Sequence, residues 1–201
     1  DHATLARSID QLDEIFLLVI VGEFNAGKSA FINALVGPTG GGEHAGGVVR
    51  EGVTPTTATL HVLRYGETHT ESRQSDGTLV ITAPSPLLRD VHVVDTPGTN
   101  AIVREHERLT TEFVPRADLV LFVTSAERPF TETERAFMET IRAWGKKIVI
   151  VVNKIDILER ESDERDVLAF VETAATRVLG VRPDVFPVSA RLAQRAKRGD
   201  P

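Results

Sequence analysis

The segment that most restricts the fold is an apolar run, IFLLVIV at residues 15–21, which leads straight into the loop GEFNAGKSA at residues 22–30. The run has the length of a buried strand. The loop fits the pattern G-x-x-x-x-G-K-[ST] at Gly22, Gly27, Lys28 and Ser29. Small residues let successive backbone N–H groups point at phosphate oxygens, and a following helix adds the positive end of its dipole. The sequence therefore predicts a strand, a phosphate-binding loop and a helix in this order.

The predicted loop supplies the first catalytic candidates. Lys28 would bring a full charge to the β- and γ-phosphates of a nucleotide, and the Ser29 hydroxyl would ligate Mg²⁺. The expected contacts of the whole loop with the nucleotide come from Gly22, Glu23, Phe24, Asn25, Ala26, Gly27, Lys28, Ser29 and Ala30.

Strand-like and helix-like segments alternate along the rest of the chain. Near-continuous apolar runs at 117–126 and 146–156 are typical of strands covered on both faces, and an Asp-Gly pair within 69–83 predicts a hairpin that continues from the preceding strand. Further strands are expected within 58–66, 89–95 and 184–190, a glycine-rich loop at 37–52, and helices at 3–14, 29–37, 103–113, 131–144 and 162–179. This order predicts an α/β fold with a mostly parallel central sheet and helices on both faces.

Two further motifs follow predicted strands. In DTPG at 95–98, Asp95 would hold Mg²⁺ through water, and the Gly98 N–H would contact the γ-phosphate. In NKID at 153–156, the Asp156 carboxylate can accept hydrogen bonds from both guanine N1 and the 2-amino group, whereas adenine offers no such pair of donors. Asn153 would brace the loop, and the stem of Lys154 would cover the base. These motifs favour a guanine nucleotide.

The tripeptide VSA at 188–190 completes the predicted base site. It follows the last predicted strand, so the Ala190 N–H is expected to face guanine O6. Ser189 belongs to the same set of expected nucleotide contacts.

Composition narrows the classes of function. The chain has 201 residues, of which 41 % are hydrophobic and 26 % charged, as expected of one globular domain. A formal net charge of −6 argues against a general nucleic-acid binder, and the lack of cysteine excludes disulfides and thiolate metal sites. No apolar run approaches the roughly 20 residues of a membrane span, and the histidines show no ligand spacing. Four cations near the end are predicted to form a solvated helix face, with a phosphate or lipid contact as the alternative: Arg191, Arg195, Lys197 and Arg198.

In this order and on strand ends, GEFNAGKS, DTPG, NKID and VSA resemble the P-loop GTPase family over nearly the whole chain. The stretches GEFNAGKSAFINALVG, VTPTTATLHVLRYG and PSPLLRDVHVVDTPG are similar to the GTPase domain of bacterial dynamin-like proteins, which are related to the fusion dynamins of chloroplasts and mitochondria. The resemblance implies a three-layer P-loop GTPase fold over residues 1–201. It also implies hydrolysis of GTP to GDP and phosphate, with Mg²⁺ held by Ser29, Asp95 and Thr57.

For the parent protein, the resemblance implies GTP-driven membrane remodelling. The helix at 3–14 would belong to a helical bundle beside the GTPase domain, and both ends of the chain look cut from a longer protein. Membrane contact would come from regions outside this chain, and the expected location is cytoplasmic and peripheral to the membrane. GTP-loaded copies would form a homodimer across the nucleotide face, and no nucleic-acid partner is expected.

The glutamine that usually orients the attacking water in related GTPases is absent from this sequence. Thr99 follows DTPG where Ras-like GTPases carry a glutamine, and Phe24 stands where animal dynamins carry a glutamine in the phosphate loop. A switch threonine and backbone groups would hold the water instead. Thr56 and Thr57 are the candidates, and Thr54 is the third.

Asn25, in the middle of the loop, resembles the Asn of potassium-activated GTPases such as TrmE and FeoB. There its side-chain oxygen binds K⁺ between the α- and γ-phosphates, and dynamins also use a monovalent ion, K⁺ or Na⁺, at this place. Such an ion would act where an arginine finger acts elsewhere, which makes Asn25 a catalytic candidate. The alternative is that Asn25 caps the loop by bonding its own backbone. Arg50 and Arg104 flank the switch-like loops as weaker candidates for arginine fingers.

Two other functions stay open. A ribosome- or tRNA-associated GTPase of the Era or TrmE type shares the N-x-G-K-S loop, although the acidic charge and the TPTTA…VLRYG stretch favour the dynamin-like interpretation. A nucleotide-gated docking module, whose turnover is incidental, is the second alternative.

Overall fold

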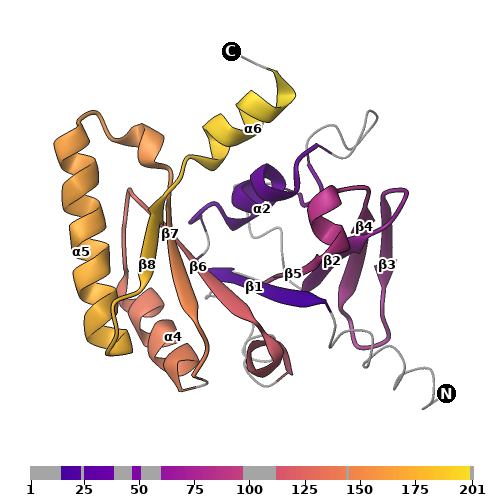
Figure 1. Cartoon of the computed structure of the whole chain (residues 1–201), viewed down its shortest axis with the longest axis horizontal. Helices are drawn as coiled ribbons and strands as arrows, with labels where there is room; N and C mark the ends of the chain where they lie inside the picture. Colours follow the sequence, from indigo (N-terminus) through magenta and orange to yellow (C-terminus); the bar gives the residue numbers. More distant parts are fainter. Residues whose placement is uncertain are drawn as a thin grey trace.

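The computed structural model describes residues 15–23, 25–38, 47–50, 60–96, 112–143 and 145–199. Within these ranges the chain forms an eight-stranded sheet with the strand order β3-β4-β2-β5-β1-β6-β7-β8 (Figure 1). β1 (Phe16–Gly22) lies inside the sheet and is parallel to both of its neighbours, β5 (Val91–Asp95) and β6 (Leu119–Ser125). The predicted α/β fold with a mostly parallel sheet is confirmed.

β6 and the two strands that follow it in the sheet order extend the parallel part of the sheet. β6 pairs with β7 (Ile148–Asn153), and β7 pairs with β8 (Asp184–Pro187) at the edge. Every residue of β7 is buried, as its apolar sequence predicts. Because these strands run in one direction, their carboxyl ends meet at the edge of the sheet where α/β proteins bind ligands.

The other end of the sheet contains the predicted hairpin. β3 (Thr70–Arg73) and β4 (Leu79–Ala83) are antiparallel, and the Asp76 carboxylate in the turn accepts the Thr78 N–H at 2.9 Å. β2 (His61–Tyr65) pairs with β4 and not with β3. The hairpin therefore does not simply continue from β2. The more apolar β4 takes the inner position, and the exposed, polar β3 forms the edge.

Helices cover both faces of the sheet (Figure 1), and the sheet separates two hydrophobic cores. On one face, α4 (Glu132–Arg142) and α5 (Glu161–Leu179) contribute to a core that includes Phe122 and Met138. Arg142 ties these helices together, since its guanidinium donates to a backbone carbonyl of α5 at 2.9 Å. The three-layer arrangement predicted from the sequence is present.

The opposite face carries α2 (Lys28–Val36), the 3-10 helix η1 (Pro86–Arg89) and α6 (Ala190–Arg198). Their core includes Ile20 of β1 and Ile32 of α2. Gly37, with φ 85°, ends α2 as predicted.

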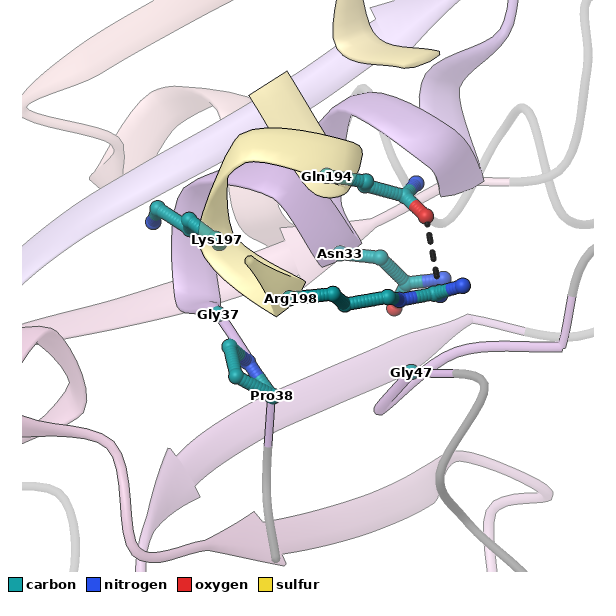
Figure 2. A pocket seen from close by; sticks show the side chains of 7 residues that line it. All are labelled: Asn33, Gly37, Pro38, Gly47, Gln194, Lys197 and Arg198. Atoms are coloured by element: carbon teal, nitrogen blue, oxygen red, sulfur yellow. Dashed lines mark hydrogen bonds between the residues drawn. The ribbon is translucent and has the colours of Figure 1, made fainter. Parts of the chain in front are cut away.

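α6 rests on α2 through polar side chains. Gln194 Nε2 donates to the Ala30 carbonyl at 2.8 Å, and Lys197 Nζ donates to the Leu35 carbonyl at 3.1 Å. Arg198 in turn donates to Gln194 Oε1 at 3.2 Å (Figure 2). The basic face predicted to be solvated is therefore used in part to hold α6 against the helix that follows the phosphate-binding loop.

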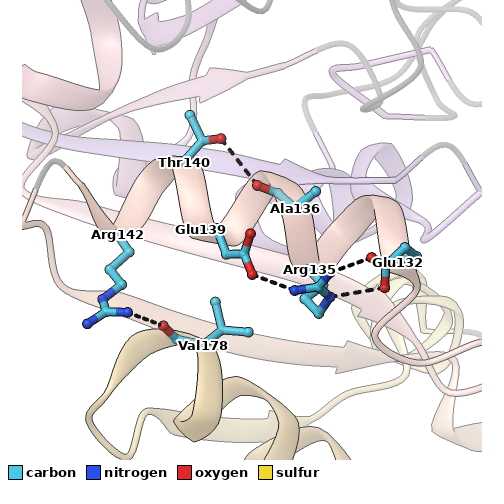
Figure 3. A network of polar contacts seen from close by, with 7 residues as sticks. All are labelled: Glu132, Arg135, Ala136, Glu139, Thr140, Arg142 and Val178. Atoms are coloured by element: carbon cyan, nitrogen blue, oxygen red, sulfur yellow. Dashed lines mark hydrogen bonds and ion pairs between the residues drawn. The ribbon is translucent and has the colours of Figure 1, made fainter.

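The solvent-facing side of α4 carries a small ionic network. The Arg135 guanidinium lies between Glu132 and Glu139, one turn to either side of it (Figure 3). Pairs of this kind on an exposed helix stabilise it by only about 0.2–0.5 kcal/mol each. This face therefore supports α4 locally and contributes little to the site.

Shorter elements complete the described structure. These are the 3-10 helices η3 (Val114–Arg116) and η4 (Ile155–Ile157). Three predicted segments lie wholly or mostly outside the described residues: the helix at 3–14, residues 103–111 of the helix at 103–113, and most of the glycine-rich loop at 37–52. In the described ranges, no helix is long and apolar enough to cross a membrane.

Candidate nucleotide-binding site

The loop between β1 and α2 has the backbone that its glycine pattern predicts. Gly27 is left-handed, with φ 84°, and a Cβ there would lie 2.4 Å from Asn153 Nδ2. A Cβ at Gly22 would lie 2.1 Å from the Val123 carbonyl oxygen of β6. Asn25 is also left-handed, with φ 68°. The loop is therefore a tight turn that larger residues at Gly22 and Gly27 would disrupt.

Lys28 begins α2, and its side chain turns back over the loop. Its Nζ donates to the Gly22 carbonyl at 3.0 Å and to the Glu23 carbonyl at 3.2 Å. Burial lowers the pKa of Lys28, and the carboxylates of Asp95, Glu134 and Glu23 oppose that shift. A buried ammonium among acidic groups at a helix N-terminus is suited to neutralise phosphate charge.

Asn153, at the end of β7, connects two loops of the site. Its Nδ2 donates to the carbonyls of Ala26 at 3.0 Å and Gly27 at 3.3 Å, and its Oδ1 accepts the Ala190 N–H at 3.0 Å. This geometry has the form of the predicted brace. The Ala190 N–H, expected at guanine O6, is donated to Asn153, so a contact with O6 requires that hydrogen bond to be shared or exchanged.

Asp156, the predicted guanine acceptor, lies in η4 beside the start of α6. Its Oδ1 accepts from Ser189 Oγ at 2.6 Å, and its Oδ2 pairs with Arg191 Nη2 at 2.7 Å. Lys154, with φ 64°, precedes η4, and its stem approaches the phosphate-binding loop. Its Nζ lies 3.7 Å from a Glu127 carboxylate oxygen. The predicted base-recognising residues thus lie together at the carboxyl ends of β7 and β8.

Asp95 ends β5 directly beside Ile20 of β1 and is fully buried. Among the described residues, neither of its carboxylate oxygens has a hydrogen-bond partner of normal geometry, and His61 Nδ1 lies 3.7 Å from Oδ2. Burial raises the pKa of Asp95 to about 6, and Lys28 opposes the rise.

These unpartnered oxygens fit a hard cation. Mg²⁺ prefers oxygen ligands and usually keeps several waters, which suits a buried carboxylate whose oxygens lack hydrogen-bond partners of normal geometry in the described part of the chain. Asp95 and the hydroxyl of Ser29, at the start of α2, would hold the ion together with the nucleotide phosphates. Thr57, the third predicted ligand, lies outside the described residues.

A polar network connects the loop to the start of α4. Thr131 Oγ1 donates to Glu23 Oε1 at 2.9 Å and accepts the Glu134 N–H at 3.2 Å. Glu134 Oε2 accepts from the Thr131 N–H at 3.0 Å and from Thr124 Oγ1 at 2.9 Å. Thr131 and Glu134 thus form a capping box that also reaches the phosphate-binding loop.

Glu134 lies at a cavity of about 190 Å³ beside the loop. Burial raises the pKa of Glu134 to about 7, and the hydrogen bonds from Thr124 and Thr131 oppose the rise. Asn25 lines the same cavity. The remaining lining residues are Glu23, Ala26, Ser125, Glu127 and Arg128.

The structure brings most of the predicted site residues to one edge of the sheet: Gly22, Glu23, Asn25, Ala26, Gly27, Lys28, Ser29, Ala30, Asp95, Asn153, Lys154, Asp156, Ser189 and Ala190. Arg50 is described and exposed. The others lie outside the described residues: Phe24, Thr54, Thr56, Thr57, Gly98, Thr99 and Arg104.

Three residues that support the site were not predicted from the sequence: Thr131, Glu134 and Arg191. Thr131 and Glu134 match the capping-box pattern T-x-x-E, but that pattern predicts only the start of a helix and not a contact with the phosphate-binding loop. Arg191 carries no local signal, because its partner Asp156 is reached only through the packing of α6. The residues that support the nucleotide loops are therefore harder to read than the loops themselves.

The fold and this site define a P-loop GTPase domain. The chain belongs to the family described as 50S ribosome-binding GTPases, whose model matches residues 17–154.

Curated relatives include GTPases of two kinds. The chain is 43 % identical over 199 residues to the "Probable transmembrane GTPase FZO-like, chloroplastic" of Arabidopsis thaliana, a match that covers 96 % of this chain and 21 % of that protein. It is 28 % identical over 207 residues to GTPase Der of Geobacter metallireducens, covering 98 % of this chain and 40 % of that protein. The chain thus spans less than half the length of these relatives.

Solved structures agree on the fold. A chain described as an oligomerised bacterial dynamin pair, with a mechanism for the long-range sensing and tethering of membranes, aligns with a TM-score of 0.74 at 18 % identity, over 98 % of this chain and 36 % of that one. Era in complex with MgGDPNP and a segment of 16S ribosomal RNA aligns with a TM-score of 0.61 at 18 % identity, over 92 % and 54 %. Together the comparisons confirm a GTPase domain, since the family model and both relatives are GTPases. The bacterial dynamin pair and Era share its fold.

Proposed function

We propose that this GTPase domain drives membrane remodelling, by fusion, fission or tethering, as part of a longer dynamin-like protein. The observation that carries the proposal is the 43 % identity to the FZO-like GTPase, which extends over 96 % of this chain. In that protein the matched region is only 21 % of the length, so membrane contact would come from other regions of the parent. The parent would be cytoplasmic and peripheral to the membrane, with residues 1–201 as its GTPase domain.

The chemistry proposed for the domain is positioning together with charge neutralisation. Bound Mg²⁺ would supply charge neutralisation at the phosphates. Lys28 is buried beside the loop and would add its charge to the β- and γ-phosphates, while the loop N–H groups bind their oxygens. Asn153 and Lys154 would hold the loop and the base, and Asp156 would select guanine.

The attacking water is proposed to be held without a glutamine. Thr56 or Thr57 is the candidate for that role, and the Gly98 N–H would contact the γ-phosphate. Asn25 would bind K⁺ or Na⁺ through its side-chain oxygen, which is supported by its place in the loop and at the cavity beside it.

We further propose that two GTP-loaded domains associate across the nucleotide face and complete each other's catalytic site. GTP hydrolysis per molecule should then rise with protein concentration. GDP with aluminium fluoride, a mimic of the transition state, should produce dimers in analytical ultracentrifugation, and GDP alone should not. Constant specific activity together with a monomer in every nucleotide state would contradict this proposal.

The description of the matching family and the RNA-bound structure of Era, which shares the fold, favour one other function, that of a ribosome-associated GTPase. Titration of the domain with a 16S ribosomal RNA fragment, in GTP and in GDP, separates the two. The dynamin-like proposal expects weak binding that depends on neither nucleotide nor RNA sequence. Tight, GTP-dependent RNA binding without dimer formation would support the ribosomal function instead.

A further inference from the structure

Both carboxylate oxygens of Asp156 are already engaged by the chain itself. Ser189 Oγ donates to Oδ1 at 2.6 Å, and the Arg191 guanidinium pairs with Oδ2 at 2.7 Å. The Asp156 side chain is only 9 % exposed in this arrangement, whereas the Arg191 side chain is 70 % exposed. Arg191 therefore covers the carboxylate from the solvent side, which is the side from which a base must arrive.

The group on Oδ2 chemically resembles the edge of guanine. The N1, C2 and 2-amino atoms of guanine form a guanidine unit, with two N–H donors side by side. An arginine guanidinium presents the same pair of donors, in a planar fork that fits a carboxylate, and adds a positive charge. Arg191 thus satisfies Asp156 with the same type of donor that the base would bring.

The backbone that carries Arg191 is held in place. The Ala190 N–H is bonded to Asn153 Oδ1, Ser189 Oγ accepts the Leu192 N–H at 3.2 Å, and Gln194 anchors α6 to α2. The exposed guanidinium can leave Asp156 by rotation of its side chain, without any shift of α6. The ion pair has to break for guanine to reach Oδ2, whereas Ser189 can keep its bond to Oδ1, because a carboxylate oxygen can accept more than one hydrogen bond.

We propose that Arg191 is a gate on the guanine pocket: it occupies Asp156 as a surrogate for the base and must be displaced before the nucleotide can bind. The inference rests on the guanine-nucleotide binding of the domain. The gate slows association, because the carboxylate is accessible only while the ion pair is open. It leaves dissociation unchanged, because Arg191 has already left Asp156 in the bound state.

The test measures association and dissociation rates separately, by stopped-flow fluorescence with GDP labelled on the ribose. Arg191→Ala should associate about two- to fivefold faster than the wild type, as expected for loss of one largely exposed ion pair, with an unchanged dissociation rate. Arg191→Lys, which keeps the charge but lacks the planar fork, should lie between them. Arg195→Ala is the matched control, since it removes the same charge from the same helix away from Asp156.

Salt provides a second readout. Ionic strength screens the pair between Arg191 and Asp156, so the advantage of Arg191→Ala over the wild type should shrink as salt is added. Unchanged association in Arg191→Ala would overturn the gate. Faster dissociation with unchanged association would show instead that Arg191 contacts the bound base. If the wild type bound no guanine nucleotide at all, the proposed GTPase function would be wrong. That result differs from the two outcomes that contradict the gate.

Discussion

Thr131 Oγ1 donates a 2.9 Å hydrogen bond to Glu23 Oε1 across a separation of 108 residues in the sequence. The bond joins the first residue after β1 to the N-cap of α4. One hydroxyl thus serves both a helix cap and the phosphate-binding loop, and the two roles can be separated by mutation.

Thr131→Ala should lower the free energy of unfolding by about 1 kcal/mol, because the helix loses its cap. Glu23→Ala should cost about 0.5 kcal/mol or less, since it removes only the partly exposed link and leaves the cap intact. Both variants should weaken nucleotide binding, because the loop loses its tie to α4. Urea unfolding and nucleotide titration measure the two effects, with Thr131→Ser as the control that keeps both bonds. Equal losses of stability in the two alanine variants would argue against this division of roles.

Glu134 should make the stability of the domain depend on pH. Its pKa is raised to about 7 in the folded protein from an ordinary 4.5, with Glu23 and Lys28 as the charged neighbours. Between these values the folded state binds more protons than the unfolded state, so stability should fall as pH rises from about 4.5 to about 7. The contribution is on the order of 1–3 kcal/mol.

Glu134→Gln tests this assignment, because glutamine does not titrate. The difference in unfolding free energy between the variant and the wild type should change across that pH interval and be constant above it. Thermal or urea unfolding at several pH values, without nucleotide, measures the slope. Parallel curves for both proteins would assign the pH dependence to other groups.

Asn153→Ala should be among the most damaging substitutions in the site. It removes the donor to Ala26 and Gly27 and the acceptor for the Ala190 N–H. The Gly27 carbonyl keeps its bond from the Phe31 N–H, but the buried Ala26 carbonyl and Ala190 N–H lose these partners. We expect a loss of about 1–3 kcal/mol in unfolding free energy, together with weaker nucleotide binding. Asn153→Asp keeps the acceptor for the Ala190 N–H but places a carboxylate oxygen against the Ala26 and Gly27 carbonyls, so it should be at least as damaging as alanine. Full nucleotide affinity in Asn153→Ala would mean that the brace is not needed.

Asp156→Asn should change the preferred base from guanine to xanthine. Xanthine carries a carbonyl where guanine carries its 2-amino group, so it can pair with the amide of asparagine. GTP binding should weaken sharply, and binding of xanthosine triphosphate should strengthen. Competition titrations of both nucleotides against the variant measure the exchange. GTP affinity equal to that of the wild type would remove Asp156 from the base site.

Asn25→Ala should abolish any activation by potassium. At constant ionic strength, the wild type should hydrolyse GTP faster in K⁺ than in Cs⁺, whereas Asn25→Ala should show equal, low rates in both. Na⁺ is the third condition, since the proposed site would accept either ion. If the wild type is no faster in K⁺ than in Cs⁺, Asn25 has a structural role.

Much of the site could be predicted from the sequence because its motifs depend on neighbouring residues. Left-handed backbone at Gly27 and close packing at Gly22 require glycine, so the loop pattern itself reveals its shape. Apolar runs such as IVIVVN reveal strands buried on both faces. Asp76 and Gly77 predicted the hairpin but not its place in the sheet, because a turn motif does not determine which of the two strands pairs with β2.

By itself, the sequence determined the phosphate-binding loop, the order of strands and helices along the chain, and the guanine motif, since each depends on neighbouring residues and on strand ends that a parallel sheet brings together. Only the tertiary structure decided that Thr131 holds Glu23 and that Arg191 covers Asp156. These contacts join side chains from separate elements, whose relative positions come from packing of the two cores. A local pattern contains no information about that packing, so the supporting and gating residues became visible only in the folded domain.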